Sequence, residues 1–310
     1  MKIEYSIIIP VYNAENTVEA LVTRIEWVFN KISSSFEIIL IDDYSNDRSW
    51  DILKKIRSDN PKTKIIRLIR NFGQHNAILA GLNNCAGRFI ITLDDDLQHP
   101  PEEIPKLISK INRGYSIVYG SYIPQHGSFI ENYLSQIYQK LVHNILEAPD
   151  ELFFSSFVIY KRETIQNMIS IKSSYPFLPA MAIKSAPLNK ISSIEVAHHK
   201  REKGESNYGL IKYLKYSLNL ILNYSSLPLV LVALCGFLVS AVSILLGVWI
   251  VIRKIADPSY GVMGWNSLMV AICFIGGAIL TSMGIIGEYL QRIITETSHG
   301  QQYVISEMEL

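Results

Sequence analysis

Residues 36–45 read FEIILIDDYS, an apolar run that ends in the acids Asp42 and Asp43. Short apolar runs bounded by polar turn residues are typical of a buried β-strand. Residues 5–13, YSIIIPVYN, and residues 89–98, FIITLDDDLQ, follow the same design. In open α/β sheets ligands bind beyond the carboxyl ends of the strands, and here three such ends carry polar or acidic residues.

Segments with apolar residues at helical spacing separate these strand-like runs over the first 120 residues. Such alternation is the signature of a mostly parallel sheet with crossover helices, so we predict an α/β layer sandwich. The predicted strands are Tyr5–Pro10, Phe36–Asp42, Lys64–Leu68, Phe89–Asp94, Ser116–Gly120, Ser155–Lys161 and Ile191–His199, and the predicted helices are Asn16–Lys31, Ser49–Arg57, Gln74–Cys85, Glu102–Asn112 and Ile130–Leu146.

Two long stretches near the C-terminus carry no charge. Leu227–Ile252 and Met263–Ile286 contain no Asp, Glu, Lys or Arg, and each exceeds the roughly 20 apolar residues that span a bilayer. We therefore expect two transmembrane helices. Residues 207–226, which mix lysines with tyrosines, are predicted to form an amphipathic membrane-surface helix, with a solvated loop followed by a core helix as the alternative.

The N-terminus lacks the apolar core of a secretory signal, so we expect an inner-membrane, multi-pass protein with both termini in the cytoplasm. The net charge of +1 argues against a nucleic-acid partner. The three cysteines have no metal-type spacing, so neither disulfides nor zinc are expected. The expected organisation is a catalytic domain over 1–206, a surface helix over 207–226, a two-helix anchor over 227–293 and a cytoplasmic tail over 294–310.

Acidic residues crowd two of the predicted strand ends. If Asp42, Asp43 and Asp94–Asp96 follow neighbouring strands, at least four carboxylates converge, and their repulsion is costly without a cation. Oxygen ligands of this kind suit Mg²⁺ or Mn²⁺. Each acidic group alone is as readily a turn or a helix cap. The chain has no G-x-G-x-x-G or P-loop motif, which disfavours dinucleotide redox chemistry and P-loop hydrolysis.

Four motifs together resemble one enzyme family. Ile8–Asn13, Leu40–Ser45, Arg70–His75 and Thr92–Glu102, with its Asp-x-Asp motif, are similar to the family-two polyprenyl-phosphate glycosyltransferases of GT-A fold. That group includes dolichyl-phosphate mannose synthase and the bacterial undecaprenyl-phosphate glucosyl and aminoarabinose transferases. The resemblance extends over nearly the whole chain, because residues 199–208 and 284–293 also match.

The resemblance implies transfer of a sugar from a nucleotide donor, with UDP the expected nucleotide, to a polyprenyl phosphate at the membrane, in the service of cell-envelope glycans or lipids. We also expect a homo-oligomer. By the resemblance and the acceptor's charge, the nucleotide-binding residues would be Pro10, Tyr12, Glu15, Asp42, Asp43, Asp94 and Asp95. The ligands of Mg²⁺ or Mn²⁺ would be Asp94, Asp96 and Gln98, and the residues that contact the acceptor phosphate would be Lys161, Arg162, Arg201, Lys203 and Ser206. The catalytic residues would be Asp96, Arg201 and Lys203.

The chain departs from the family pattern at residues 155–160, where Ser156 and Val158 replace an acid and an arginine, and at Ala14, where an acid is usual and Glu15 follows instead. The missing acid does not exclude catalysis, because a phosphate monoester with a second pKa of about 6 is already a dianion at neutral pH and needs no base. Direct displacement would invert the anomeric carbon.

Three other functions compete with this one. The departures leave open a non-catalytic membrane adaptor that binds nucleotide sugars. A processive polysaccharide synthase would need more spans and a Gln-x-x-Arg-Trp motif, which the chain lacks. A transporter would need a polar pathway, which two charge-free spans do not offer.

Overall fold

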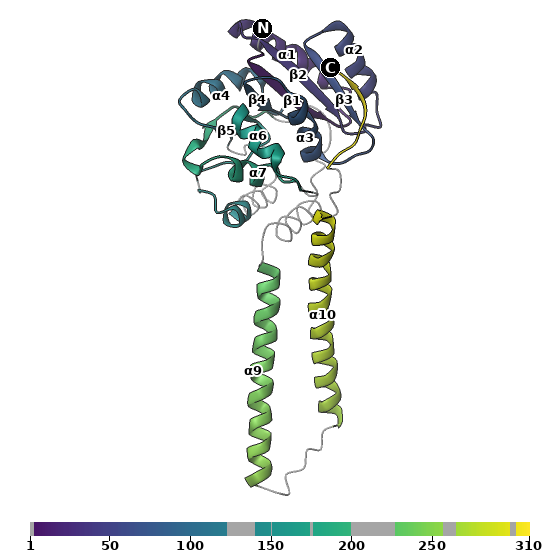
Figure 1. The fold of residues 1–310 in the computed structure, drawn as a ribbon, viewed down its shortest axis with the longest axis vertical. Helices are drawn as coiled ribbons and strands as arrows, with labels where there is room; N and C mark the ends of the chain where they lie inside the picture. The colour runs from purple at the N-terminus through teal and green to yellow at the C-terminus, as the bar shows by residue number, and fades with distance from the viewer. Residues whose placement is uncertain are drawn as a thin grey trace. The chain divides into compact units, whose positions relative to one another are not determined.

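The computed structural model describes residues 3–122, 140–149, 151–173, 176–199, 227–256, 265–297 and 302–310. Its chain forms two compact units (Figure 1). The first comprises Met1–Tyr213 together with His299–Leu310, and the second comprises Leu214–Ser298. The residues that follow the second unit in sequence therefore belong to the first.

An eight-stranded sheet is the centre of the first unit, with the strand order β7-β5-β6-β4-β1-β2-β3-β8. The four neighbours from β4 to β3 are parallel to one another, whereas β6 is antiparallel to both β4 and β5, and β8 is antiparallel to β3. The strands are β1 (Tyr5–Val11), β2 (Phe36–Asp42), β3 (Thr63–Leu68), β4 (Phe89–Thr92), β5 (Ile117–Ser121), β6 (Val158–Lys161), β7 (Ile191–Glu195) and β8 (Ile305–Glu309).

Helices cover both faces of this sheet. Strand β2 is buried along its whole length, which explains its continuous apolar sequence. Ile38 and Leu40 belong to the same core as the buried side of α1, whereas an added Cβ on Gly81 of α3 would meet Ile41 from the other face. The helices of this unit are α1 (Val18–Ile32), α2 (Ser49–Asp59), α3 (Gln74–Asn84), α4 (Ile104–Ile111), α6 (Arg162–Ser170) and α7 (Leu178–Ser185), with 3₁₀ turns at Pro101–Glu103 and Leu188–Lys190.

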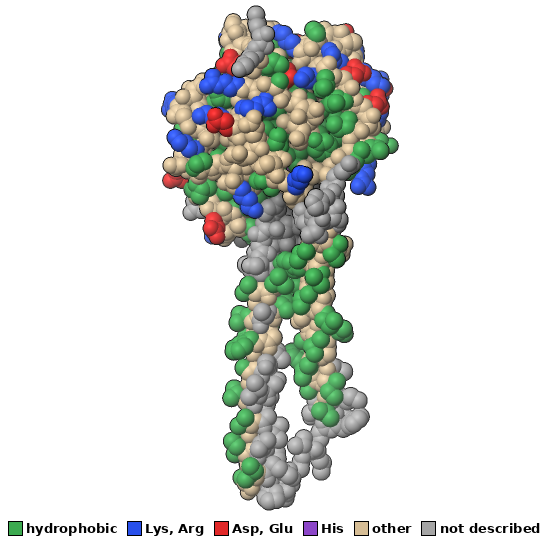
Figure 2. Space-filling view, in the orientation of Figure 1, with side chains coloured by type: hydrophobic (Ala, Val, Ile, Leu, Met, Phe, Trp, Pro, Cys, Tyr) green, Lys and Arg blue, Asp and Glu red, His purple; other side chains and the backbone are tan. Residues whose placement is uncertain are grey.

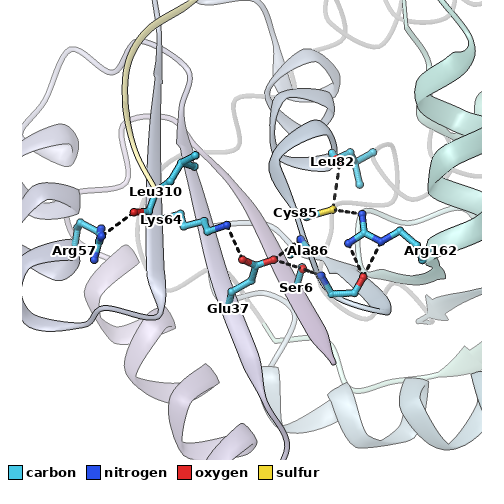
Figure 3. Close-up of polar contacts among 10 residues, drawn as sticks. Ser6, Glu37, Arg57, Lys64, Leu82, Cys85, Ala86, Arg162 and Leu310 are labelled. Carbon is cyan, nitrogen blue, oxygen red and sulfur yellow. Dashed lines mark hydrogen bonds and ion pairs between the residues drawn. The ribbon is translucent and has the colours of Figure 1, made fainter. Parts of the chain in front are cut away.

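A buried carboxylate ties the amino ends of the central strands together (Figure 3). Oε1 of Glu37 accepts hydrogen bonds from the Ser6 hydroxyl (2.6 Å) and the Ala86 N–H (2.6 Å), and Oε2 lies 2.9 Å from Nζ of Lys64. Burial opposes ionisation, but these hydrogen bonds and the lysine prevail and lower the pKa of Glu37. Three strands and the loop that enters β4 therefore share one ionised group.

Most predicted elements of the first unit are present, with ends that differ by a few residues. The strand predicted over Ser155–Lys161 begins at Val158, and the one predicted over Ile191–His199 ends at Glu195. Of the helix predicted over Ile130–Leu146, residues 140–146 are helical and the others lie outside the described residues, as does the predicted surface helix over 207–226. The predicted cytoplasmic tail contains β8, which the sequence analysis did not identify as a strand.

The second unit consists of two long helices, α9 (Leu227–Ala256) and α10 (Trp265–Thr297). Apolar side chains lie along both helices (Figure 2). Several of them are largely exposed, including Phe237 at 70%, Leu245 at 69% and Leu280 at 71%. Judged by length and hydropathy over the described residues, neither helix qualifies as a membrane-crossing segment.

We expect the Glu37→Ala substitution to destabilise the first unit by about 3 kcal/mol, because it leaves Lys64 without its buried partner. For a unit of this size, that loss corresponds to a fall in melting temperature of about 6–12 °C. Since the pKa of Glu37 is lowered by folding, its contribution is present at neutral pH and disappears as the pH falls through the folded-state pKa.

Thermal unfolding of the purified protein at pH 7 and at pH 3 measures both effects. The exposed Glu195, at the end of β7, is the control, and its substitution by Ala should change the melting temperature little. Equal melting temperatures for the Glu37→Ala variant and the wild type at pH 7 would contradict the anchoring role.

Candidate active site at the carboxyl edge of the sheet

Three strand ends meet at the carboxyl edge of the sheet. The register pairs Val11 with Asp42 across β1 and β2, and Ile8 with Thr92 across β1 and β4. The loops that follow are joined by hydrogen bonds, because the Tyr12 N–H donates to Oδ2 of Asp95 (3.0 Å). The motifs predicted to converge are therefore in direct contact.

Each of the three loops contains a non-glycine residue in the left-handed backbone region. These are Asn13 at φ 56°, Tyr44 at φ 62° and Leu97 at φ 61°. A positive φ is uncommon outside glycine, and such residues cluster at functional sites where surrounding structure holds them in place. Here the support includes a hydrogen bond from the Asn13 N–H to the Ser45 hydroxyl oxygen (3.0 Å).

Both carboxylate oxygens of Asp94 are held by side chains from other elements. Nε2 of Gln74, at the start of α3, donates to Oδ1 (2.7 Å), and the Ser156 hydroxyl donates to Oδ2 (2.5 Å). The backbone oxygen of Ser156 accepts a hydrogen bond from the Thr92 hydroxyl (2.7 Å), which fixes Ser156 beside β4. The residue in place of the family's acid therefore orients a predicted metal ligand. Val158 is buried in β6 opposite Thr92.

The turn after Asp94 presents further oxygen donors. Oδ1 of Asp96 accepts a hydrogen bond from the Gln98 N–H (3.1 Å), and the backbone oxygen of Gln98 accepts one from the His199 N–H (2.8 Å). The described residues contain no group of three or more His, Cys, Asp or Glu side chains arranged to hold a metal ion. Two carboxylates nevertheless suit Mg²⁺ or Mn²⁺, which take their remaining ligands from substrate phosphates and water. The donor set therefore fits a divalent ion.

His99 follows this turn and is only 5% exposed. Burial lowers the pKa of His99 to about 4, against the opposing effect of Asp96, so the ring is neutral at pH 7. It lies among aromatic rings, 5.5 Å from Phe157 and 5.2 Å from His198 between centroids. His198 in turn stacks on Tyr122 at 3.9 Å. These rings pack the turn against the segment that leads to residue 199.

The acids after β2 are buried. Asp43 is 4% exposed, and its two oxygens accept hydrogen bonds from the N–H groups of Phe72 (2.7 Å) and Gly73 (2.8 Å). Burial raises the pKa of Asp43 to about 6 despite these hydrogen bonds. Asp42 is fully buried and lies 3.2 Å from Nε of Arg67. Both acids thus support the neighbouring loops, and direct contact of their carboxylates with a nucleotide stays a prediction.

Two exposed aromatic side chains stand beside these acids, Tyr12 at 45% and Tyr44 at 46%. Tyr12 is among the predicted nucleotide-binding residues, whereas Tyr44 is not, although an aromatic residue directly after two strand-end acids is a signal for it. Pro10 is buried in β1. Glu15 accepts hydrogen bonds from the Arg48 N–H (3.1 Å) and side chain (3.4 Å), so it links the segments before α1 and α2.

Lys161 and Arg162 do not join this site. Val158 pairs with Thr92 at the carboxyl end of β4, whereas Lys161 pairs with Phe89 at its amino end, because β6 runs antiparallel. Asp94 lies five positions after Phe89 in the chain, which corresponds to about 16 Å of extended backbone. Arg162 donates from Nε (2.8 Å) and Nη2 (2.5 Å) to the Gly87 oxygen (Figure 3). The structure therefore places these two residues away from the acidic turn, and their contact with an acceptor phosphate stays a prediction.

Three predicted residues, Arg201, Lys203 and Ser206, lie outside the described residues. The described residues before them end at His199, whose N–H donates to the backbone oxygen of Gln98 beside the acidic turn.

Comparison with known proteins gives a consistent assignment. The profile described as "Glycosyl transferase family 2" matches residues 6–182. The undecaprenyl-phosphate 4-deoxy-4-formamido-L-arabinose transferase of Serratia proteamaculans is 32% identical over 98% of this chain and 93% of its own length. The uncharacterized glycosyltransferase YkcC of Bacillus subtilis is 31% identical over 98% of this chain and 94% of its own.

A solved structure shares the fold. Glucosyl-3-phosphoglycerate synthase from Mycobacterium tuberculosis, crystallised with Mn²⁺, UDP-glucose and phosphoglyceric acid, superposes with a TM-score of 0.53 at 18% identity, covering 71% of this chain and 77% of that one. This similarity confirms the predicted α/β fold of GT-A type. The chain is a glycosyltransferase and belongs to glycosyl transferase family 2.

Proposed function

We propose that this protein transfers a sugar from a UDP-linked donor to a polyprenyl phosphate, with inversion at the anomeric carbon. The carrying observation is the junction of three strand ends, where Gln74 and Ser156 hold Asp94 next to the Asp95–Tyr12 hydrogen bond. Relatives that match 98% of the chain are named undecaprenyl-phosphate 4-deoxy-4-formamido-L-arabinose transferases. The glucosyl-3-phosphoglycerate synthase of the same fold was crystallised with Mn²⁺ and UDP-glucose.

Asp94, Asp96 and Gln98 are the residues that would hold a divalent cation. Such an ion supplies Lewis-acid stabilisation to a departing diphosphate. Gln74 and Ser156 fix the orientation of Asp94 before substrate arrives, which lowers the reorganisation required during the reaction. The exposed rings of Tyr12 and Tyr44 provide apolar faces for a nucleoside at the adjoining loops.

The acceptor needs charge neutralisation more than it needs a base. A polyprenyl phosphate with a second pKa of about 6 is largely dianionic at pH 7. A serine hydroxyl that donates to Asp94 is a poor general base, so Ser156 does not replace the family's acid in that role. We assign the neutralising role to Arg201 and Lys203, because both are cations within residues 199–208, which resemble the family.

We further propose that α9 and α10 enter the cytoplasmic membrane as a hairpin. The charge-free stretches Leu227–Ile252 and Met263–Ile286 and the exposed apolar side chains of both helices support this proposal. Residues 1–213, before α9, and the strand β8, after α10, belong to one folded unit. Both ends of a membrane hairpin must therefore lie on the same side, and we propose that this side is the cytoplasm.

We expect Asp96→Asn to lower kcat/KM by at least about 100-fold, the scale of losing one electrostatic contact to a transition state. The assay combines undecaprenyl phosphate, Mn²⁺ and a panel of nucleotide sugars, with lipid products read by mass spectrometry. Chelation should have the same effect as the substitution, and Mn²⁺ binding followed by electron paramagnetic resonance should weaken in the variant.

The exposed Asp51 of α2 provides the matched control, since Asp51→Asn removes the same charge away from the site. Full activity in excess chelator would remove the metal from the mechanism. Nucleotide-sugar binding without product from any donor would favour a non-catalytic adaptor instead.

We expect Arg201→Ala to lower kcat/KM. The loss of transition-state stabilisation calculated from that change should be at least about 2 kcal/mol, the scale of a charge-assisted contact to a buried charge. Asp150→Asn and Glu151→Gln, the nearest preceding carboxylates, should have far smaller effects. The pH profile of kcat/KM should rise with one limb near the acceptor's second pKa of about 6. A large loss from Asp150→Asn with little from Arg201→Ala would show that a carboxylate acts as the base.

The hairpin is tested by cysteine labelling in intact cells with an impermeant maleimide. Glu309→Cys, on the exposed side of β8, should remain unlabelled until the cells are permeabilised. Ser259→Cys, between the two charge-free stretches, should be labelled without permeabilisation. Labelling of the Glu309→Cys variant in intact cells would reverse the proposed orientation.

A further inference from the structure

The last residues of the chain form one edge of the catalytic sheet. Strand β8 pairs antiparallel with β3, with Arg67 opposite Glu307. The Ile69 N–H donates to the Val304 oxygen (3.0 Å), and the Ser306 hydroxyl donates to the Arg67 oxygen (3.1 Å). Beyond the strand, Nη2 of Arg57 donates to the Leu310 oxygen (2.9 Å; Figure 3). The backbone that carries Arg67 is therefore held by the C-terminal strand.

Arg67 lies in a row of alternating charge that crosses three strands. The register places Asp42 of β2 opposite Arg67 of β3, and Arg67 opposite Glu307 of β8. Nε of Arg67 is 3.2 Å from Oδ2 of Asp42, and Nη1 is 3.8 Å from Oε1 of Glu307. Oε2 of Glu307 is also 3.8 Å from Nζ of Lys54. The row lies near the carboxyl ends of β2 and β3, and its Asp42 end adjoins the candidate active site.

The guanidinium of Arg67 also supports an aromatic residue of the site. Its central carbon lies 5.7 Å from the ring centroid of Tyr44 and 5.3 Å from that of Trp50. A cation over an aromatic face at this separation is attracted by the ring quadrupole. Trp50 is buried, whereas Tyr44 is exposed. One side chain thus reaches both the acid and the aromatic residue of the Asp42–Ser45 loop.

Asp42 requires this cation. The carboxyl group is fully buried, and its Oδ1 accepts a hydrogen bond from the Ser45 N–H (3.1 Å), which leaves Oδ2 facing Arg67. A buried carboxylate that loses its charge partner is strongly destabilised and turns toward water or takes up a proton. Either response would move the loop that presents Tyr44.

We propose that Arg67 and Glu307 are positioning residues of the nucleotide site: Glu307 holds the guanidinium of Arg67, which holds Asp42 and Tyr44 in the geometry that receives the nucleoside. The inference rests on the proposed function, because it assumes that a nucleoside diphosphate occupies this edge. It assigns the C-terminal strand, 239 residues from Arg67 in sequence, to the donor site rather than to a tail.

The test is a double-mutant cycle on nucleotide affinity in the full-length protein. Titration calorimetry with UDP and Mn²⁺ would compare the wild type, Arg67→Met, Glu307→Gln and the double variant. We expect Arg67→Met to raise the Kd by about tenfold and Glu307→Gln by about threefold, in line with the side chain of Glu307 being 49% exposed. In the Arg67→Met background, Glu307→Gln should have no further effect, because the two residues act through one contact.

Two measurements separate positioning from a general loss of structure. Salt at 1 M screens a half-exposed ion pair, so the difference between the wild type and Glu307→Gln should disappear there. The KM for the donor should rise in both variants, while kcat should stay unchanged. Glu309→Gln is the matched control on the same strand, since Glu309 has no ion pair among the described residues, and its Kd for UDP should equal that of the wild type.

Each outcome decides the question. An unchanged Kd in Glu307→Gln, additive effects in the cycle, or an equal loss in Glu309→Gln would overturn the inference and leave the proposed function intact. If Arg67→Met does not fold, the salt dependence of Glu307→Gln alone decides. Failure of the wild type to bind UDP would overturn both the inference and the UDP-linked donor of the proposed function.

Discussion

The ionised carboxylate of Glu37 is the constraint on which the central sheet depends. It lies among Ser6, Ala86 and Lys64, so it joins β1, β2, β3 and the loop before β4 at their amino ends. The close approach of that loop is set by Gly87, where an added Cβ would lie 2.5 Å from the Ser6 nitrogen. Because parallel strands locked at one end keep their register along their length, this group also determines which residues meet at the other end.

At the carboxyl ends of the strands, backbone N–H groups and hydroxyls donate hydrogen bonds that fix the carboxylates in place. Asp43 accepts from Phe72 and Gly73, and Asp95 accepts from Tyr12. Such hydrogen bonds stabilise each charge. Asp42 also faces the guanidinium of Arg67. The acidic turn at Asp94–Asp96 is the proposed site of a divalent ion, whereas the hydrogen bonds of Asp43 and the contact of Asp42 with Arg67 support the loops around them.

The sequence predicted the parallel sheet and the meeting of its three loaded ends, because burial on both faces of a strand and acids at its end are local signals. Where a side chain lies also depends on strand direction, which is not a local signal. Lys161 is the last residue of β6, whose antiparallel course carries it away from the acidic turn, and no residue near it reveals that course. The sequence shows Ser156 only as a replacement for the family's acid. Its hydrogen bond to Asp94 is not apparent there, because the two residues are 62 positions apart. The strand β8 is too short and too exposed for its sequence to indicate a partner.

The order of synthesis gives the edge strand a further consequence. Residues 305–309 follow α9 and α10 in the chain, so β3 has an unpaired edge throughout the synthesis of these two helices. Unpaired edges recruit other strands and promote aggregation. A chain that ends before residue 305 keeps that edge unpaired. The strand β8 therefore closes the sheet only after both long helices have been synthesised.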